Sequence, residues 1–144
     1  MKDAYTNAFH GVIRDAQAKY GYELPVHLEA YVVMLLSFYI DRPNWQPEPS
    51  FAEAYLTIQQ RHNAKELGDA CLFASGVFPT LGSRKGLPRS YYSNIGISSY
   101  EMVADALENE LFSQLAKHFI FLSEFIEIAV NPRLTTSAQN NLFR

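Results

Sequence analysis

The stretch LFSQLAKHFIFLSEFIEIAV, residues 111–130, carries the clearest fold signal in the chain. Its apolar side chains recur at spacings of three, four and seven residues, which is the pattern of one buried helix face. That face consists of Leu111, Leu115, Leu122, Phe125, Ile126 and Ala129, with Phe119 beside it. Asn131 and Pro132 follow and stop the pattern, so we expect one long helix that ends there.

A second helix is predicted in LPVHLEAYVVMLLSFYIDRP, residues 24–43. Pro25 suits its first turn, because the missing proline N–H would be unpaired at that position anyway. Apolar residues cover the helix nearly all round, which is typical of a helix at the centre of a domain. Pro43 restricts the residue before it, so we expect the helix to end near Asp41.

Start signals indicate further helices. An amphipathic pattern over 3–19 ends before Gly21. Ser50-Phe-Ala-Glu53 reads as a capping box, and we expect a helix of roughly a dozen residues after it. Whether 51–78 forms one kinked helix or two stays open at this point. Another capping box over 98–101 predicts a bend or break at Gly96.

The rest of the pattern contains no alternating strand signal and no Asn-Gly or Asp-Gly hairpin turn. The sequence therefore predicts an all-α fold: a compact single-domain bundle of five to seven helices, without a sheet, over residues 1–144. Residues 133–144 are polar, and we expect them to form a frayed tail.

Composition excludes several classes of protein. The formal net charge of the 144 residues is -3, which lacks the basic footprint of a general nucleic-acid binder. Cys71 is the one cysteine, so neither an internal disulfide nor a four-cysteine metal site can form, and its apolar surroundings favour a buried thiol. The longest apolar run, 30–40, falls short of the roughly 20 residues of a membrane span. No signal peptide is visible, and we expect a cytoplasmic protein without a membrane partner.

Known catalytic and metal-binding patterns do not occur. No histidine follows a glutamate by three residues, as di-iron bundles require, and there is no HExxH, P-loop, GxGxxG or GxSxG motif. His62 and Glu66 lie four residues apart, but this spacing is more typical of a solvent-facing capping pair than of a metal site, which needs three or more ligands. We therefore expect no catalytic constellation, metal or cofactor.

The stretch GSRKGLPRSYYSNIG, residues 82–96, is the strongest candidate for a binding site. It brings Arg84, Lys85 and Arg89 next to Tyr91 and Tyr92, just where a helix is predicted to start. Because amides at a helix start also carry partial positive charge, we expect at least one of the three cations to pair with an acidic side chain, and the remainder to be able to hold a small anion. The alternative is that all three cations are solvated, as exposed loop cations usually are. Adjacent helix positions differ by about 100°, so one tyrosine is expected to be more buried than the other.

Asp69 is the acidic candidate for such a pair. It precedes a helix segment that is almost entirely apolar, and a buried carboxylate is costly unless it is paired. If it points inward, Arg84, Arg89 or a tyrosine hydroxyl is a plausible partner. The alternative is a place on the exposed edge of the helix.

Residues 66–104 resemble a family of uncharacterised bacterial proteins. The family pattern places Gly-Asp, Ser-Gly, Phe-Pro, a basic pair, a tyrosine pair, a glycine and Ser-Tyr in this order. Here these elements fall on Gly68, Asp69, Gly76, Phe78, Pro79, Arg84, Lys85, Tyr91, Tyr92, Gly96 and Tyr100. Ser99 stands where alanine is common, and residues 24–43 extend the likeness. The resemblance implies a bacterial, mostly helical domain and no known activity.

Two functions compete at this stage. One is a non-enzymatic interaction or regulatory module that binds another protein, a second copy of the chain included, because tyrosine and phenylalanine are enriched at interface cores. The other is a small anionic-ligand-binding protein or enzyme whose site gathers Asp69, Arg84, Lys85, Arg89, Tyr91 and Tyr92. The second requires these six side chains to converge on one pocket.

Overall fold

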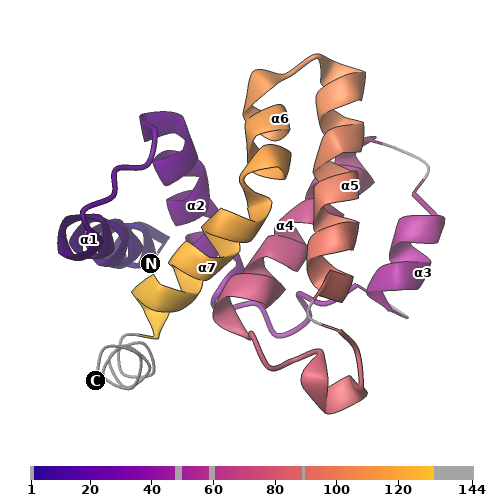
Figure 1. The fold of residues 1–144 in the computed structure, drawn as a ribbon, viewed down its shortest axis with the longest axis horizontal. Coiled ribbons are helices and arrows are strands. Elements are labelled where there is room, and N and C mark those ends of the chain that lie inside the picture. The colour runs from indigo at the N-terminus through magenta and orange to yellow at the C-terminus, as the bar shows by residue number, and fades with distance from the viewer. Residues whose placement is uncertain (1, 48–49, 59–60, 89, 132–144) are drawn as a thin grey trace.

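The computed structural model describes residues 2–47, 50–58, 61–88 and 90–131, and this part of the chain is built from helices without a strand (Figure 1). In chain order these are α1 (Lys2–Tyr20), α2 (Val26–Tyr39), α3 (Phe51–Leu56), α4 (Arg61–Val77), the 3-10 turn η1 (Ser83–Lys85), α5 (Ser90–Leu107), α6 (Glu110–Lys117) and α7 (Phe119–Val130). The predicted compact all-α bundle is confirmed. The predicted frayed tail lies outside the described residues.

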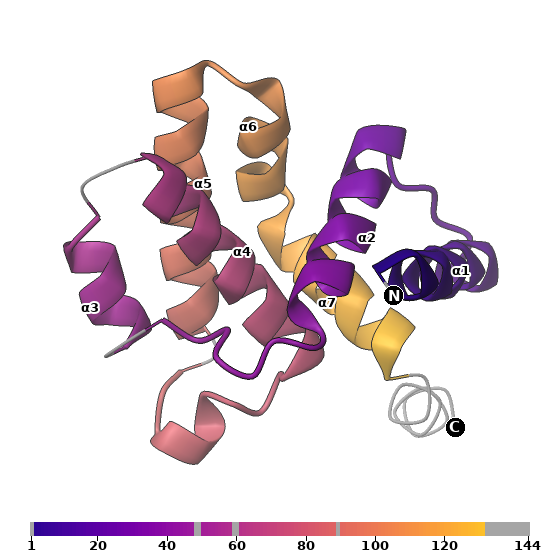
Figure 2. The same cartoon turned by 180° about the vertical axis from the view of Figure 1, so that it is seen from behind.

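The helix α4 forms the centre of the bundle. It packs most extensively against α5 and next against α7, and it also touches α2 and α3. Seen from both sides, α1 and α2 lie at one end of the molecule and α3 at the other (Figures 1 and 2). The unbroken buried run 67–74 follows from this central place.

Gly96 lies inside a continuous helix, so the predicted bend or break there is wrong. A Cβ atom at this position would meet the Phe119 ring at 2.5 Å and Cys71 Cβ at 2.8 Å. The glycine therefore serves close approach of α5 to α4 and α7, and its conformational freedom is not used. The helix runs through Ser98, and the capping-box pattern there does not start a new helix.

The predicted single helix over 111–129 is also wrong, because the chain turns at His118. That residue has φ -103° and ψ 16°, outside the helical range, and it separates α6 from α7. Because of this turn, the two halves of the apolar face over 111–129 pack on different helices. The helix α6 packs along α5, whereas α7 packs mainly on α4. Phe119, the first residue after the turn, becomes completely buried.

The open question about 51–78 is answered by two separate helices. Ser50 caps α3 as predicted, with its Oγ accepting a hydrogen bond from the Glu53 N–H at 3.1 Å. The helix ends after six residues instead of a dozen. The hydroxyl of Thr57 donates to the Glu53 carbonyl at 3.0 Å and so occupies a carbonyl of the last turn.

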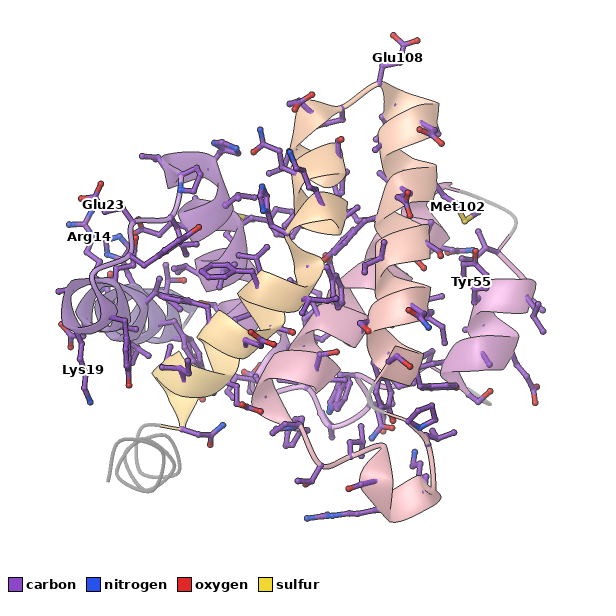
Figure 3. All side chains as sticks on the ribbon, in the orientation of Figure 1. Arg14, Lys19, Glu23, Tyr55, Met102 and Glu108 are labelled. Atoms are coloured by element: carbon purple, nitrogen blue, oxygen red, sulfur yellow. The ribbon has the colours of Figure 1, made fainter. Side chains whose placement is uncertain are left out.

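The helix α3 is fastened to the start of α5. The Ala52 N–H donates to the Tyr91 hydroxyl at 2.9 Å, and the Phe51 ring meets the Tyr92 ring edge-on at 4.9 Å. Figure 3 shows Tyr55 of α3 and Met102 of α5 on the facing sides of the two helices. Both tyrosines of the 82–96 stretch therefore have structural contacts.

The helix α2 begins after Pro25 as predicted and ends at Tyr39, two residues before the expected end. It is not enclosed by the bundle, although its composition predicted a central helix. Met34 is 66% exposed and Phe38 is 45% exposed, one turn apart on the outer side.

Candidate functional site

Asp69 is a buried carboxylate that connects three helices. It is 5% exposed. Its Oδ1 accepts hydrogen bonds from the Tyr31 hydroxyl of α2 at 2.6 Å and the Tyr100 hydroxyl of α5 at 2.7 Å. Its Oδ2 accepts from the Lys65 ammonium group at 2.8 Å, one turn earlier on α4. Of the partners considered from the sequence, a tyrosine hydroxyl is therefore the correct one, and the exposed-edge alternative is wrong.

Gly68 makes this arrangement possible. A Cβ at Gly68 would lie 2.7 Å from two ring carbons of Tyr100, so only a glycine lets the ring lie flat against α4. With the ring in this place, its hydroxyl reaches Asp69 on the next residue. In the Gly-Asp pair of the sequence, Gly68 thus leaves room for the Tyr100 ring and Asp69 accepts a hydrogen bond from its hydroxyl.

The tyrosines around Asp69 are fixed as hydrogen-bond donors. Burial raises the pKa of the Tyr100 hydroxyl well above its ordinary value, and the nearby Asp69 charge raises this pKa further. Burial and then Asp69 raise the pKa of Tyr31 in the same way, and also that of Tyr39. The hydroxyls therefore keep their protons far beyond neutral pH, which suits holding a carboxylate and does not suit proton transfer.

A pocket of about 780 Å³ opens beside this carboxylate. Its walls come from α2, the connection after it, α3 and the first half of α4. The apolar part comprises Met34, Leu35, Phe38, Trp45, Pro47, Ala54, Ile58, Leu67 and Ala70, and the tyrosines 31 and 39 add their rings. Lys65 and Asp69 lie in the wall as well. The volume lies within the usual range for small-molecule sites.

Trp45 anchors the connection that forms one wall. Its indole stacks on the Phe78 ring at 5.5 Å with an interplanar angle of 7°, and it meets the Phe73 ring edge-on at 5.1 Å. These contacts hold the segment after α2 against α4. The wall is therefore set by the fold before any ligand arrives.

Two cations at the pocket retain free donor groups. Lys65 uses one N–H on Asp69 and has three in total. Arg42 donates from Nε to the Phe38 carbonyl at 2.9 Å, and its guanidinium lies 3.7 Å from the centre of the Phe38 ring. Its remaining N–H groups are uncommitted in the described part of the chain. The pocket thus offers strong donors next to an aromatic surface.

The six residues singled out from the sequence do not meet in one pocket. Asp69 lines the pocket just described, whereas Tyr92 lines a different one. Arg84 and Lys85 are exposed on η1, and neither forms an ion pair within the described residues. Arg89 lies outside the described residues. Tyr92 is 5% exposed and Tyr91 is half-buried, so the predicted difference between the two is confirmed.

Sequence reasoning missed Tyr31, Lys65 and Tyr100. The pair Lys65 and Asp69 is one helical turn apart, so its spacing could have revealed it. The tyrosines are 38 and 31 residues from Asp69, and no local pattern links them to it. The expectation of a buried thiol at Cys71 is confirmed, and burial raises the pKa of this thiol.

No protein-family model matches the chain, and neither a curated protein nor a solved structure matches it. Among the described helices, none is both long and apolar enough to span a bilayer. Within the same residues, no three histidine, cysteine or acidic side chains lie together as a metal site would need.

Proposed function

We propose that the protein binds a small amphipathic anion in the pocket beside Asp69 and that it does so without catalysing a reaction. The ligand has a flat apolar body and one acidic group, such as an aryl or acyl carboxylate. The observation that carries this proposal is the combination, in one pocket, of an aromatic wall with the uncommitted donors of Arg42 and Lys65.

The aromatic wall favours the apolar body. Tyr31, Phe38, Tyr39 and Trp45 contribute rings from two adjoining segments. Aromatic surfaces bind flat apolar groups through their large contact area, with ring pairs adding about 0.5–1.5 kcal/mol beyond burial. Binding would also cover Met34 and Phe38, which are exposed in the free protein.

The charged groups favour the acidic end. Asp69 does not repel an anion strongly, because its charge is shared among two hydroxyls and one ammonium group. Arg42 and Lys65 are at the same pocket with donors left over. Glu66 also lines the pocket and is exposed, so the acidic group of the ligand is expected to lie on the Arg42 side.

The chemistry of the site favours binding over catalysis. The tyrosines keep their protons because burial raises their pKa values, and both oxygens of Asp69 already accept hydrogen bonds. A general base needs an accessible lone pair near the reacting group. The groups of this pocket instead form a preorganised binding surface.

A matched pair of probes tests the proposal. Naphthalene-2-carboxylate and naphthalene-2-carboxamide share the same apolar body and differ in charge. Each is titrated against the protein while the emission of Trp45, the one tryptophan, is followed. The carboxylate is expected to bind about tenfold more tightly than the amide, since a charge-assisted hydrogen bond contributes about 1.5–3 kcal/mol.

Two arginine variants provide the control. Arg42→Gln is expected to bring the two affinities together, whereas Arg84→Gln, which removes an exposed cation outside the pocket, leaves the preference unchanged. Equal affinities for both probes in the wild type contradict the anion part of the proposal. Failure of both probes to change Trp45 emission contradicts the pocket itself.

Self-association through the same face is a second candidate function. It is favoured by the exposure of Met34 and Phe38 one turn apart on α2. A second copy would cover this apolar surface. Light scattering after size exclusion is expected to give the mass of a dimer for the wild type and of a monomer for Met34→Glu. A monomeric wild type at high concentration rules this candidate out.

A further inference from the structure

A second pocket lies on the stretch that stood out in the sequence. It has a volume of about 490 Å³ and shares no described lining residue with the pocket beside Asp69. Its walls come from the end of α4, the connection with η1, the start of α5 and the first turns of α7. The lining residues are Ser75, Phe78, Pro79, Gly82, Ser83, Leu87, Pro88, Ser90, Tyr92, Ser93, Ile120, Ser123 and Glu124.

Two buried hydroxyl groups of this pocket have no hydrogen-bond partner among the residues that the structure describes. They are the Ser75 Oγ and the Tyr92 hydroxyl. Tyr92 is 5% exposed and is one of the lining residues of the pocket. Buried polar groups are nearly always hydrogen-bonded, and an unpaired one calls for a specific reason. Two such groups in the wall of one pocket point to a ligand that supplies their partners.

Three further hydroxyl groups of the wall have already used their protons. Ser83 donates to the Thr80 carbonyl at 2.8 Å, Ser93 to the Ser90 carbonyl at 3.2 Å and Ser123 to the Ile120 carbonyl at 2.8 Å. Each of these oxygens retains only acceptor capacity. The wall of the pocket is therefore richer in acceptors than in donors.

Charge points in the same direction. Glu124 is exposed and adds an acceptor, and the described lining contains no lysine or arginine. A phosphate or sulfate ion is negatively charged, so Glu124 repels it and no lysine or arginine of the described lining offsets its charge. Arg84 and Lys85 belong to η1 beside the pocket but do not line it. This pocket is accordingly not the anion site that the basic stretch suggested.

We propose that this second pocket binds a small uncharged polyhydroxylated molecule, of the monosaccharide or cyclitol class. Its hydroxyl groups can donate to Ser83, Ser93, Ser123 and Glu124. Directly or through one bridging water, they can also pair with the free hydroxyls of Ser75 and Tyr92. The apolar C–H face of such a ring can lie on Phe78, which is half-exposed.

The adjacent tyrosines give a matched pair of variants. The Tyr91 hydroxyl accepts from the Ala52 N–H at 2.9 Å, whereas the Tyr92 hydroxyl has no partner within the described part of the chain. Without ligand, Tyr92→Phe and Ser75→Ala are expected to raise the thermal midpoint, because each removes an unpaired buried hydroxyl. Tyr91→Phe is expected to lower it. A lower midpoint for Tyr92→Phe overturns the premise that this hydroxyl is free for a ligand.

Binding is tested by two-dimensional amide NMR, because polyols stabilise most proteins by exclusion and a thermal shift would not be specific. The probes are myo-inositol and methyl α-D-glucopyranoside, with inorganic phosphate as the charged comparison. At least one polyol is expected to shift amide signals of 75–93 and 120–124 saturably. In Tyr92→Phe its dissociation constant rises at least fivefold, and in Tyr91→Phe it stays within twofold.

Three results overturn the proposal. The first is the absence of saturable shifts with both polyols, and the second is equal affinity in the wild type and Tyr92→Phe. The third is a phosphate that shifts the same signals and competes with the polyol. The amide signals followed here, 75–93 and 120–124, include no lining residue of the pocket beside Asp69, so failure here is distinguishable from failure there.

Discussion

Replacing Tyr100 by phenylalanine tests how much the connection at Asp69 contributes to the fold. The Tyr100 ring is fully buried, and its hydroxyl donates to the Asp69 carboxylate at 2.7 Å. Phenylalanine keeps the ring against Gly68 and removes only the donor. Hydrogen bonds to charged groups contribute about 1.5–3 kcal/mol, so we expect a loss of roughly this size in the free energy of unfolding.

Removing the acceptor instead, with Asp69→Ala, is expected to lower the free energy of unfolding by more than Tyr100→Phe does. It leaves the hydroxyls of Tyr31 and Tyr100 without an acceptor, and the second of these lies wholly inside the protein. A buried hydroxyl left without a partner typically costs about 1–3 kcal/mol. In the double variant there is no Tyr100 hydroxyl to leave unpaired. Its loss in the free energy of unfolding is therefore expected to be smaller than the sum of the losses in the two single variants.

Urea unfolding followed by circular dichroism and by Trp45 emission measures these free energies. Tyr22→Phe serves as the control, because Tyr22 is exposed and its hydroxyl makes no hydrogen bond within the described residues. The reasoning is refuted if Tyr100→Phe matches the control within about 0.5 kcal/mol, or if the double variant is strictly additive.

Three further predictions concern backbone, pH and thiol chemistry. Gly96→Ala is expected to lower the free energy of unfolding by about 1–3 kcal/mol, since the new Cβ would meet Phe119 at 2.5 Å. Gly11→Ala is expected to stabilise α1 by about 0.5–1 kcal/mol, because nothing lies within 4 Å of the new Cβ. Urea unfolding of both variants measures these changes. The pKa of Tyr100 is raised above its ordinary value of 10.0, so the unfolded chain loses this proton before the folded protein does, and the free energy of unfolding falls as pH rises above about 10. In Tyr100→Phe this fall is expected to be shallower by up to about 1.4 kcal/mol per pH unit. Urea unfolding at a series of alkaline pH values measures the difference. The buried thiol of Cys71, whose pKa burial raises, is expected to react with a disulfide reagent only at the rate of unfolding, and rapid reaction in the native state contradicts its burial.

The helices themselves could be predicted from the sequence, because periodicity and caps are local. Ser50 and Pro25 marked real starts, and the apolar face over 111–129 is helical on both sides of His118. The turn at His118 could not be predicted, since it exists to let α6 and α7 pack on different helices. The bend predicted at Gly96 was wrong for a similar reason. The small size of this residue allows a close contact with Phe119, which lies in another part of the chain.

The candidate site was predictable in part. Asp69 stood out because a charge next to an apolar run needs a partner, and the partner proved to be a tyrosine hydroxyl. The choice of Tyr31 and Tyr100 depends on how α2 and α5 lie across α4, and no local spacing contains that information. Arg84 and Lys85 of the basic stretch line neither pocket.

The indole N–H signal of Trp45 tests the central proposal most directly. The chain has one tryptophan, so its side chain gives one such signal in a two-dimensional NMR spectrum, and this residue lines the pocket beside Asp69. We expect naphthalene-2-carboxylate to shift this signal saturably at concentrations where the carboxamide leaves it in place. A signal that moves equally with both compounds, or with neither, contradicts the assignment of this pocket as a site for an amphipathic anion.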